Sequence, residues 1–260
     1  MNESQEPLFP AGTALVIGGS GGIGSTICRE LARAGSDVAL TYHRNETRAA
    51  EVAQDIRRMG RSASIHALST HDDAQVRAVI DNVAAQAGRI HTVVFAAAAV
   101  TEQVYLSQIS RGQWQRALDE EVTGFYNVVQ ASLPLMKAAG GGSYVHLGSA
   151  GDVRWANRDA LSIVPKAAIE AMVRGVAREE GRYGIRANSV LVGVIEAGMF
   201  LELRRQGVFD DRWIEATYRN QALKRLGRPE EIAHSAVFLA SSKAAFVTGQ
   251  QIAVAGGYGL

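Results

Sequence analysis

The sequence predicts an α/β fold: a Rossmann-type, doubly wound parallel sheet of about seven strands in a single domain. Short apolar runs alternate with longer amphipathic segments along the whole chain. Many apolar runs are continuous rather than alternating, which is expected when helices cover both faces of a parallel sheet. No repeat, linker or low-complexity tract interrupts this pattern, so residues 1–260 are interpreted as one domain.

The apolar runs and the amphipathic segments give the expected elements in order. Strands are expected at Thr13–Gly18, Asp37–Tyr42, Ser62–Ala67, Thr92–Ala96, Ser143–Leu147, Arg186–Leu191 and Gln251–Val254. Helices are expected at Ile23–Ala34, Glu46–Met59, Ala74–Ala87, Gly112–Ala138, Pro165–Tyr183 and Pro229–Ala240. The stretch 194–226 is too long for an ordinary connection and is interpreted as a substrate lid. Its apolar residues Met199, Phe200, Leu201 and Leu203 suit a hydrophobic substrate, or alternatively an ordinary amphipathic helix.

The first expected strand runs directly into the glycine-rich turn Gly18-Gly-Ser20-Gly-Gly22-Ile23-Gly24 and then into a helix. Glycines allow a tight turn and a close approach of the backbone to a pyrophosphate, and the helix N-terminus offers unpaired N–H groups to it. This context predicts a dinucleotide site, and a plain flexible turn is the alternative.

Composition excludes several classes of protein. The chain is 47% hydrophobic and 20% charged, with a net charge of +1 and no long run of like charge, which argues against binding to nucleic acid or to a membrane surface. The single cysteine, Cys28, has no intrachain disulfide partner and is expected in the core. Segment 1–10 lacks a signal pattern and no apolar run reaches membrane-span length, so a cytoplasmic location is expected. The sequence contains no Cys/His cluster, so no metal site is predicted.

The residues after the second expected strand bear on the choice of cofactor. Ligands of such sheets bind beyond the carboxyl ends of the strands. Tyr42-His43-Arg44-Asn45 contains no acidic residue to bind a ribose 2′-hydroxyl, whereas His43 and Arg44 suit a 2′-phosphate. NADP is therefore favoured over NAD, with two solvated loop residues as the alternative.

Further motifs follow the glycine turn in a fixed order. They are Arg225-x-Gly227-x-Pro229-Glu-Glu-Ile-Ala233, Phe238-Leu-Ala-Ser241, Thr248-Gly-Gln250 and Gly256-Gly257. On these motifs the sequence resembles the short-chain dehydrogenase/reductase family, close to its ketoacyl-carrier-protein-reductase-like branch, over nearly its whole length. The resemblance implies hydride transfer between a nicotinamide and an alcohol or carbonyl carbon. It also implies a homo-oligomer, a tetramer or dimer, built on Gly112–Ala138 and Pro165–Tyr183.

The family's catalytic residues carry over only in part. Ser149 matches the serine that orients the carbonyl, and Lys166 matches the lysine that holds the ribose. Ser162 stands where the family has its acid/base tyrosine, and Glu121 stands where it has its relay asparagine. The resemblance implies cofactor contacts at Gly18, Ser20, Gly22, Ile23, Gly24, His43, Arg44, Ser69, Ala96, Lys166, Gly193 and Ile195. Among the family's contact positions, Ile17 replaces a threonine, Ser69 an aspartate and Val192 a proline.

These replacements change the proton chemistry that can be expected. A serine hydroxyl is a far weaker acid than a phenol on a shorter side chain, so Ser162 is a poor direct replacement. Glu121 could pair with Lys166 or exchange protons itself; burial would raise its pKa and the lysine would lower it. The alternative is an exposed residue of the acidic trio Asp119-Glu-Glu121.

Two further features remain open at this stage. Trp155, flanked by Arg154 and Arg158, could stack on a flat substrate or recognise an acidic group, or could cover the sheet edge or a subunit contact. His146 is expected to be structural. Three functions follow: an atypical NADPH-dependent reductase of a carbonyl or conjugated small molecule, a non-redox dehydratase, isomerase or cyclase, and a non-catalytic cofactor-binding protein.

Overall fold

The computed structural model describes residues 7–98 and 101–260, in which a parallel sheet has the strand order β3-β2-β1-β4-β5-β6-β7. The strands are β1 Thr13–Ile17, β2 Asp37–Tyr42, β3 Ala63–Ala67, β4 Ile90–Phe95, β5 Gly142–Ser149, β6 Ile185–Val192 and β7 Gln251–Val254. The strand order reverses between β1 and β4, so a topological switch point, where ligands bind in such sheets, opens beside the end of β1. The predicted fold class is confirmed.

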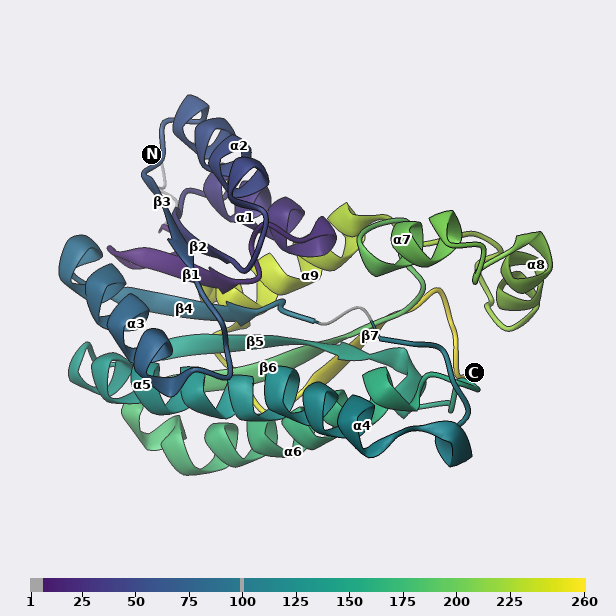
Figure 1. The fold of residues 1–260 in the computed structure, drawn as a ribbon. Helices are drawn as coiled ribbons and strands as arrows, with labels where there is room; N and C mark the ends of the chain where they lie inside the picture. The colour runs from purple at the N-terminus through teal and green to yellow at the C-terminus, as the bar shows by residue number, and fades with distance from the viewer. Residues whose placement is uncertain (1–6, 99–100) are drawn as a thin grey trace.

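Helices cover both faces of the sheet (Figure 1). One face carries α1 Gly22–Arg33, α2 Glu46–Arg58 and α9 Pro229–Ala240. The other carries α3 Asp73–Ala87, α5 Gly124–Ala138 and α6 Ala160–Glu180. The remaining helices are α4 Arg111–Ala117, α7 Met199–Arg205 and α8 Asp211–Arg219. In Figure 1, α7, α8 and the C-terminus gather at the end of the sheet toward which the strand arrows of β5 and β6 point.

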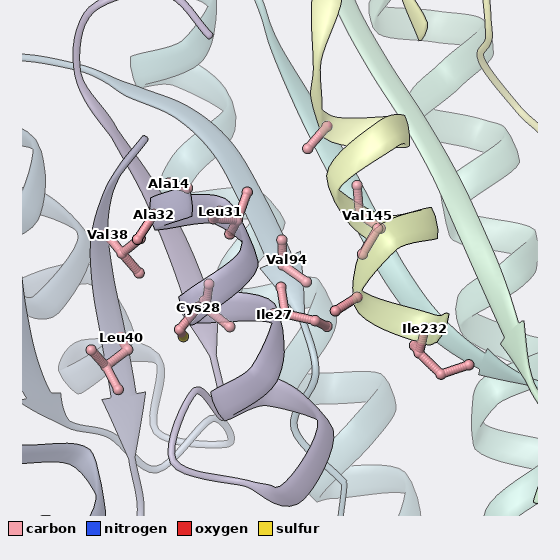
Figure 2. Close-up of a cluster of buried hydrophobic side chains, with 14 of the residues drawn as sticks. Ala14, Ile27, Cys28, Leu31, Ala32, Val38, Leu40, Val94, Val145 and Ile232 are labelled. Atoms are coloured by element: carbon pink, nitrogen blue, oxygen red, sulfur yellow. The ribbon is translucent and has the colours of Figure 1, made fainter. Parts of the chain in front are cut away.

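The core between α1, α9 and the sheet fixes the helix that follows the glycine turn. Ile27 and Leu31 of α1 lie in one buried cluster with Ile232 of α9 and with Val94 and Val145 of the sheet (Figure 2). Fully burying such side chains contributes about 1.5–3 kcal/mol each. Cys28 lies in the same core, as expected, and burial raises the pKa of its thiol.

Two helix predictions differ from the structure in ways that affect the site. The expected helix 112–138 is helical from Arg111 to Ala138, but its segment Leu118–Thr123, between α4 and α5, is π-helical. Thr70 accounts for this π-helical segment, because its Oγ1 donates to the Glu120 carbonyl at 2.8 Å. In addition, α6 begins five residues before Pro165, since the Asp159 carbonyl accepts hydrogen bonds from the N–H groups of Ser162 and Ile163.

The stretch 194–226 is not irregular, because it contains α7 and α8. Phe200 packs in a small cluster with Phe209 and Trp213, whose ring centroids are 3.7 Å apart, while Leu201 is 50% exposed. Residues 199–205 thus form an amphipathic helix, and the interpretation of 194–226 as a substrate lid stays a prediction. Among the residues described, no helix is long and apolar enough to cross a membrane. Residues 1–6 of the polar N-terminal segment lie outside the described ranges.

Candidate active site

The glycine turn packs so closely against neighbouring backbone that it leaves no room for side chains. Gly18 has a φ of 80°, and a Cβ there would lie 2.8 Å from the backbone of Ala97. A Cβ at Gly24 would lie 2.3 Å from the Gly18 carbonyl oxygen. The Gly18 N–H donates to Thr41 Oγ1 at 2.9 Å, which ties the turn to β2. Backbone conformation and close packing thus require glycine here.

The start of α1 leaves backbone N–H groups without partners in the helix. Its first helical hydrogen bond runs from Ser25 N–H to the Gly21 carbonyl, so the N–H groups before Ser25 have no partner within the helix. At Gly22 a Cβ would lie 2.4 Å from the Gly198 nitrogen, at the entrance to α7. A backbone cradle without side chains at a helix N-terminus fits a pyrophosphate group.

The other predicted cofactor residues lie along the same edge of the sheet. His43 and Arg44 are exposed after β2. Ser69 donates its N–H to Gln75 Oε1 at 2.6 Å, and its Oγ lies 3.1 Å from His71 Nδ1. The remaining positions are Ser20 in the turn, Ile23 in the first turn of α1, Ala96 after β4, and Gly193 and Ile195 after β6. All follow strand ends around the switch point, where a dinucleotide would lie.

Three of the predicted catalytic residues form one buried cluster. Lys166 Nζ donates to Glu121 Oε1 at 2.9 Å, to Glu121 Oε2 at 2.8 Å and to Ser162 Oγ at 3.4 Å. Glu121 is only 1% exposed and Lys166 7%. Ser162 and Lys166 share one side of α6 because they are four residues apart. The interpretation of Glu121 as an exposed residue is therefore wrong: the π-helical segment turns it inward, against α6.

The cluster shifts the acidity of two carboxyl groups. Burial raises the pKa of Glu121, and the ammonium of Lys166 and the ring of His146 oppose this shift only in part. Burial also raises the pKa of Asp159, which accepts a hydrogen bond from Gln103 Nε2 at 3.0 Å. A buried carboxyl with a raised pKa keeps its proton closer to neutral pH than an exposed one. Such a group suits general acid catalysis.

Ser149, the fourth predicted catalytic residue, ends β5 and lies next to the start of α6. Its Oγ accepts from the N–H of Gly151 at 3.1 Å. Gly151 in turn packs on α6, since a Cβ there would lie 2.7 Å from the Ile163 side chain. The Ser149 hydroxyl proton is still available to a carbonyl oxygen, because the bond from Gly151 uses the oxygen only as an acceptor.

Sequence reasoning missed a second buried network beside this cluster. His146 Nδ1 lies 3.0 Å from Glu170 Oε1, and Gln251 Nε2 donates to Glu170 Oε2 at 2.9 Å. Burial alone would raise the pKa of Glu170, but the hydrogen bonds from its neighbours outweigh burial and lower it. His146 is thus held by Glu170, in agreement with the expectation that it is structural. Nothing in the sequence pointed to Asp159, Gln103 or Glu170, because their hydrogen-bond partners are distant in sequence. No cluster of three metal-ligating side chains occurs in the described ranges.

The chain is similar to known proteins over nearly its full length. Residues 18–259 match a family model described as enoyl-(acyl carrier protein) reductase. The chain is 30% identical to the 3-oxoacyl-(acyl-carrier-protein) reductase FabG of Staphylococcus aureus, covering 94% of this chain and 97% of the relative. A short-chain type dehydrogenase/reductase from Mycobacterium ulcerans superposes with a TM-score of 0.89 at 28% identity, covering 96% and 90%. A blue fluorescent protein from a metagenomic library, in complex with NADPH, gives 0.87 at 30% identity, covering 96% and 98%.

Proposed function

The chain belongs to the short-chain dehydrogenase/reductase family, and we propose that it is an NADPH-dependent reductase of a carbonyl or conjugated small molecule that protonates its product without a tyrosine. The observation that carries this proposal is the buried Glu121, Lys166 and Ser162 cluster at the same sheet edge as the glycine cradle. The cofactor would bind across Gly18, Gly22 and Gly24 and would supply the hydride. The protein's own residues must then supply the proton.

A proton route can be built from the contacts in the cluster. Hydride addition to a carbonyl leaves an alkoxide, which has to take up one proton. Ser149 would hold that oxygen by a hydrogen bond. Lys166 lies between Glu121 and Ser162, so a proton that leaves Ser162 for the alkoxide is replaced through Lys166 from Glu121. Glu121 suits the source of the proton because its pKa is raised by burial. It ends the step deprotonated and is reprotonated from solvent in the next cycle.

The ammonium of Lys166 has three N–H donors, and its contacts account for all of them. The longest contact, 3.4 Å to Ser162, is the weakest of the three. We infer that Lys166 keeps this contact in the cofactor complex, as the proton route requires, together with its two contacts with Glu121. In this respect the cluster differs from a site in which the lysine serves a phenol.

NADP is the cofactor that the charges favour. His43 and Arg44 are exposed beyond β2, beside the expected ribose position. A guanidinium can bind a 2′-phosphate through two N–H groups. Replacing Arg44 by serine should weaken NADPH binding at least tenfold and leave NADH binding unchanged, since contacts of this kind contribute about 1.5–3 kcal/mol. Equal losses for both cofactors would contradict the assignment.

The proposed proton route is tested by Glu121→Gln, which keeps the size of the side chain and removes its proton. We expect kcat to fall about 100-fold, because general acid catalysis contributes a factor of this order, while NADPH affinity stays within about twofold. The wild-type kcat should fall as pH rises through the raised pKa of Glu121, and the variant should lose that limb of the profile. Stopped-flow measurement of NADPH oxidation gives kcat and the NADPH affinity at each pH.

Several outcomes would contradict this function. A Glu121→Gln variant with an unchanged pH profile would remove Glu121 from the route. Product formation without any nicotinamide would favour a non-redox dehydratase, isomerase or cyclase, for which the buried acid and ammonium also provide acid/base groups. NADPH binding without turnover on a broad substrate panel would favour a non-catalytic protein.

We also propose a homo-oligomer built on α5 and α6. Tyr126 on α5 is 53% exposed, and Tyr183 just after α6 is 40% exposed. Exposed aromatic residues on adjoining helices are typical of subunit contacts. Light scattering of the purified chain would show a mass above the 27.8 kDa of one copy.

A further inference from the structure

Two arginines between Ser149 and α6 lie against aromatic rings. The guanidinium carbon of Arg158 is 4.6 Å from the centroid of the Tyr105 ring, and its Nη2 donates to the Tyr105 hydroxyl at 3.4 Å. The guanidinium carbon of Arg154 is 5.8 Å from the centroid of the Tyr258 ring. Within residues 7–98 and 101–260, neither arginine forms an ion pair with a carboxylate.

The nearby carboxylates are engaged elsewhere. Glu102, three residues before Tyr105, pairs with Arg116 at 3.3 Å. Asp159, next to Arg158, accepts from Gln103 at 3.0 Å instead. Asp152 is the other acidic residue of the loop, and it is exposed. Both guanidinium groups therefore keep N–H donors directed to no acidic partner.

The loop is held in this arrangement by two contacts. Arg158 has a φ of 67° and is, among the described residues, the one non-glycine residue with a positive φ. Such a conformation costs about 1–3 kcal/mol and persists only where neighbouring contacts impose it. The Gln103–Asp159 hydrogen bond supplies one of these contacts. The C-terminal segment supplies another, since a Cβ at Gly259 would lie 3.1 Å from Val153 Cγ1.

The loop also borders the candidate active site. It joins Ser149 at the end of β5 to the first turn of α6, which carries Ser162. Trp155, in the same loop, is 50% exposed and stands between Arg154 and Arg158 in the sequence. A half-exposed indole in a loop with two guanidinium groups suits a flat molecule that carries a negative charge.

We propose that Arg154 and Arg158 are specificity-determining residues that bind a carboxylate of the substrate. Resting on the proposed reductase function, this narrows the substrate to a carbonyl compound that carries a carboxylate on a flat or apolar body. A guanidinium binds a carboxylate through two parallel hydrogen bonds. The aromatic rings against which Arg154 and Arg158 lie already restrict both side chains, so each guanidinium loses less conformational freedom when it binds a ligand. The carbonyl would lie toward Ser149 and the carboxylate toward the loop.

Matched acids and amides test the inference. The probes are 4-acetylbenzoate and 4-oxopentanoate, each against its uncharged amide. Calorimetry on protein saturated with NADP⁺ measures binding, and NADPH absorbance measures kcat/KM. For at least one pair we expect the acid to be favoured about tenfold or more, as for other charge-assisted contacts. Arg154→Gln and Arg158→Gln should each lower the affinity and kcat/KM for that acid about tenfold, and should change both quantities for the amide less than about twofold.

Two control variants separate recognition from structure. Arg158→Lys keeps the charge and should retain part of the preference for the acid. Arg178→Gln, at an exposed position about 27 Å along α6 from its first residue, should change neither the binding nor the kcat/KM of the acid or the amide. The inference is overturned if no acid binds, if acid and amide behave alike, or if Arg154→Gln and Arg158→Gln weaken both equally.

The same measurements separate this inference from the proposed function. Arginine-dependent binding of an acid without NADPH oxidation supports the carboxylate site and refutes the reductase. NADPH oxidation with no preference for the acid supports the reductase and refutes the carboxylate site.

Discussion

The glycine turn and the Glu121 cluster lie at the same edge of the sheet, yet they depend on different properties of the chain. The turn depends on backbone conformation and on contacts so close that a Cβ at Gly24 would lie 2.3 Å from a carbonyl oxygen. The cluster depends on three side chains from α6 and the π-helical segment, with Lys166 bonded to both oxygens of Glu121. Where packing excludes side chains, substitution is excluded as well. Where side chains meet in a buried space, one set of chemical groups can replace another without altering the fold.

The largest expected effect tests the cluster as a unit. Lys166→Met leaves both buried carboxyl oxygens of Glu121 without their hydrogen-bond donor, so the free energy of unfolding should fall by about 3–5 kcal/mol. The double variant Lys166→Met with Glu121→Leu should recover most of this loss, because no unsatisfied buried polar atom of the pair remains. Urea denaturation at pH 7 measures both. A loss below about 1 kcal/mol for Lys166→Met would show that the pair does not act as a unit.

A buried histidine outside both regions gives the next effect. Burial, reinforced by the charge of Arg89, lowers the pKa of His91 to about 4. Between that value and the ordinary pKa of 6.5, only the unfolded chain binds the proton, so the free energy of unfolding falls as pH is lowered through this window. The expected total is about 3 kcal/mol, and His91→Gln should flatten the dependence.

The sign of this effect distinguishes His91 from Glu121. The raised pKa of Glu121 means that the folded chain holds the extra proton, so the contribution of Glu121 to stability falls as pH rises above the ordinary glutamate range. Denaturation curves from pH 4 to 8 for wild type, His91→Gln and Glu121→Gln would separate the two. A wild-type stability that is flat below pH 6.5 would contradict the His91 assignment.

The smallest effect tests the glycine turn. Gly22→Ala places a methyl group 2.4 Å from the Gly198 nitrogen, so the turn or the start of α7 must shift. NADPH affinity should fall at least tenfold, about 1.4 kcal/mol, in a fluorescence titration. The matched control is Gly175→Ala on α6, where a Cβ meets nothing within 4 Å. That change should leave affinity unaltered and add about 0.5–1 kcal/mol to stability. Equal affinity in both variants would contradict the role of the turn.

The sequence predicted elements well wherever the signal was local. Continuous apolar runs located the strands to within about two residues, a precision that such patterns allow. Local patterns failed where a distant residue intervened. Thr70 binds the Glu120 carbonyl where the expected helix becomes π-helical, and no periodicity in 112–138 reveals that contact. Pro165 suggested a helix start, although it lies inside α6.

The sequence by itself determined the parallel sheet, the glycine turn and the position of Ser162 four residues before Lys166. Only the tertiary structure decided that Glu121 is buried against Lys166, that Asp159 turns to Gln103, and that Arg154 and Arg158 lie on aromatic rings. The physical reason is the distance along the sequence over which each property is set. Backbone conformation and burial patterns are properties of neighbouring residues, whereas the charge state and partner of a side chain depend on groups that only folding brings within a few ångströms.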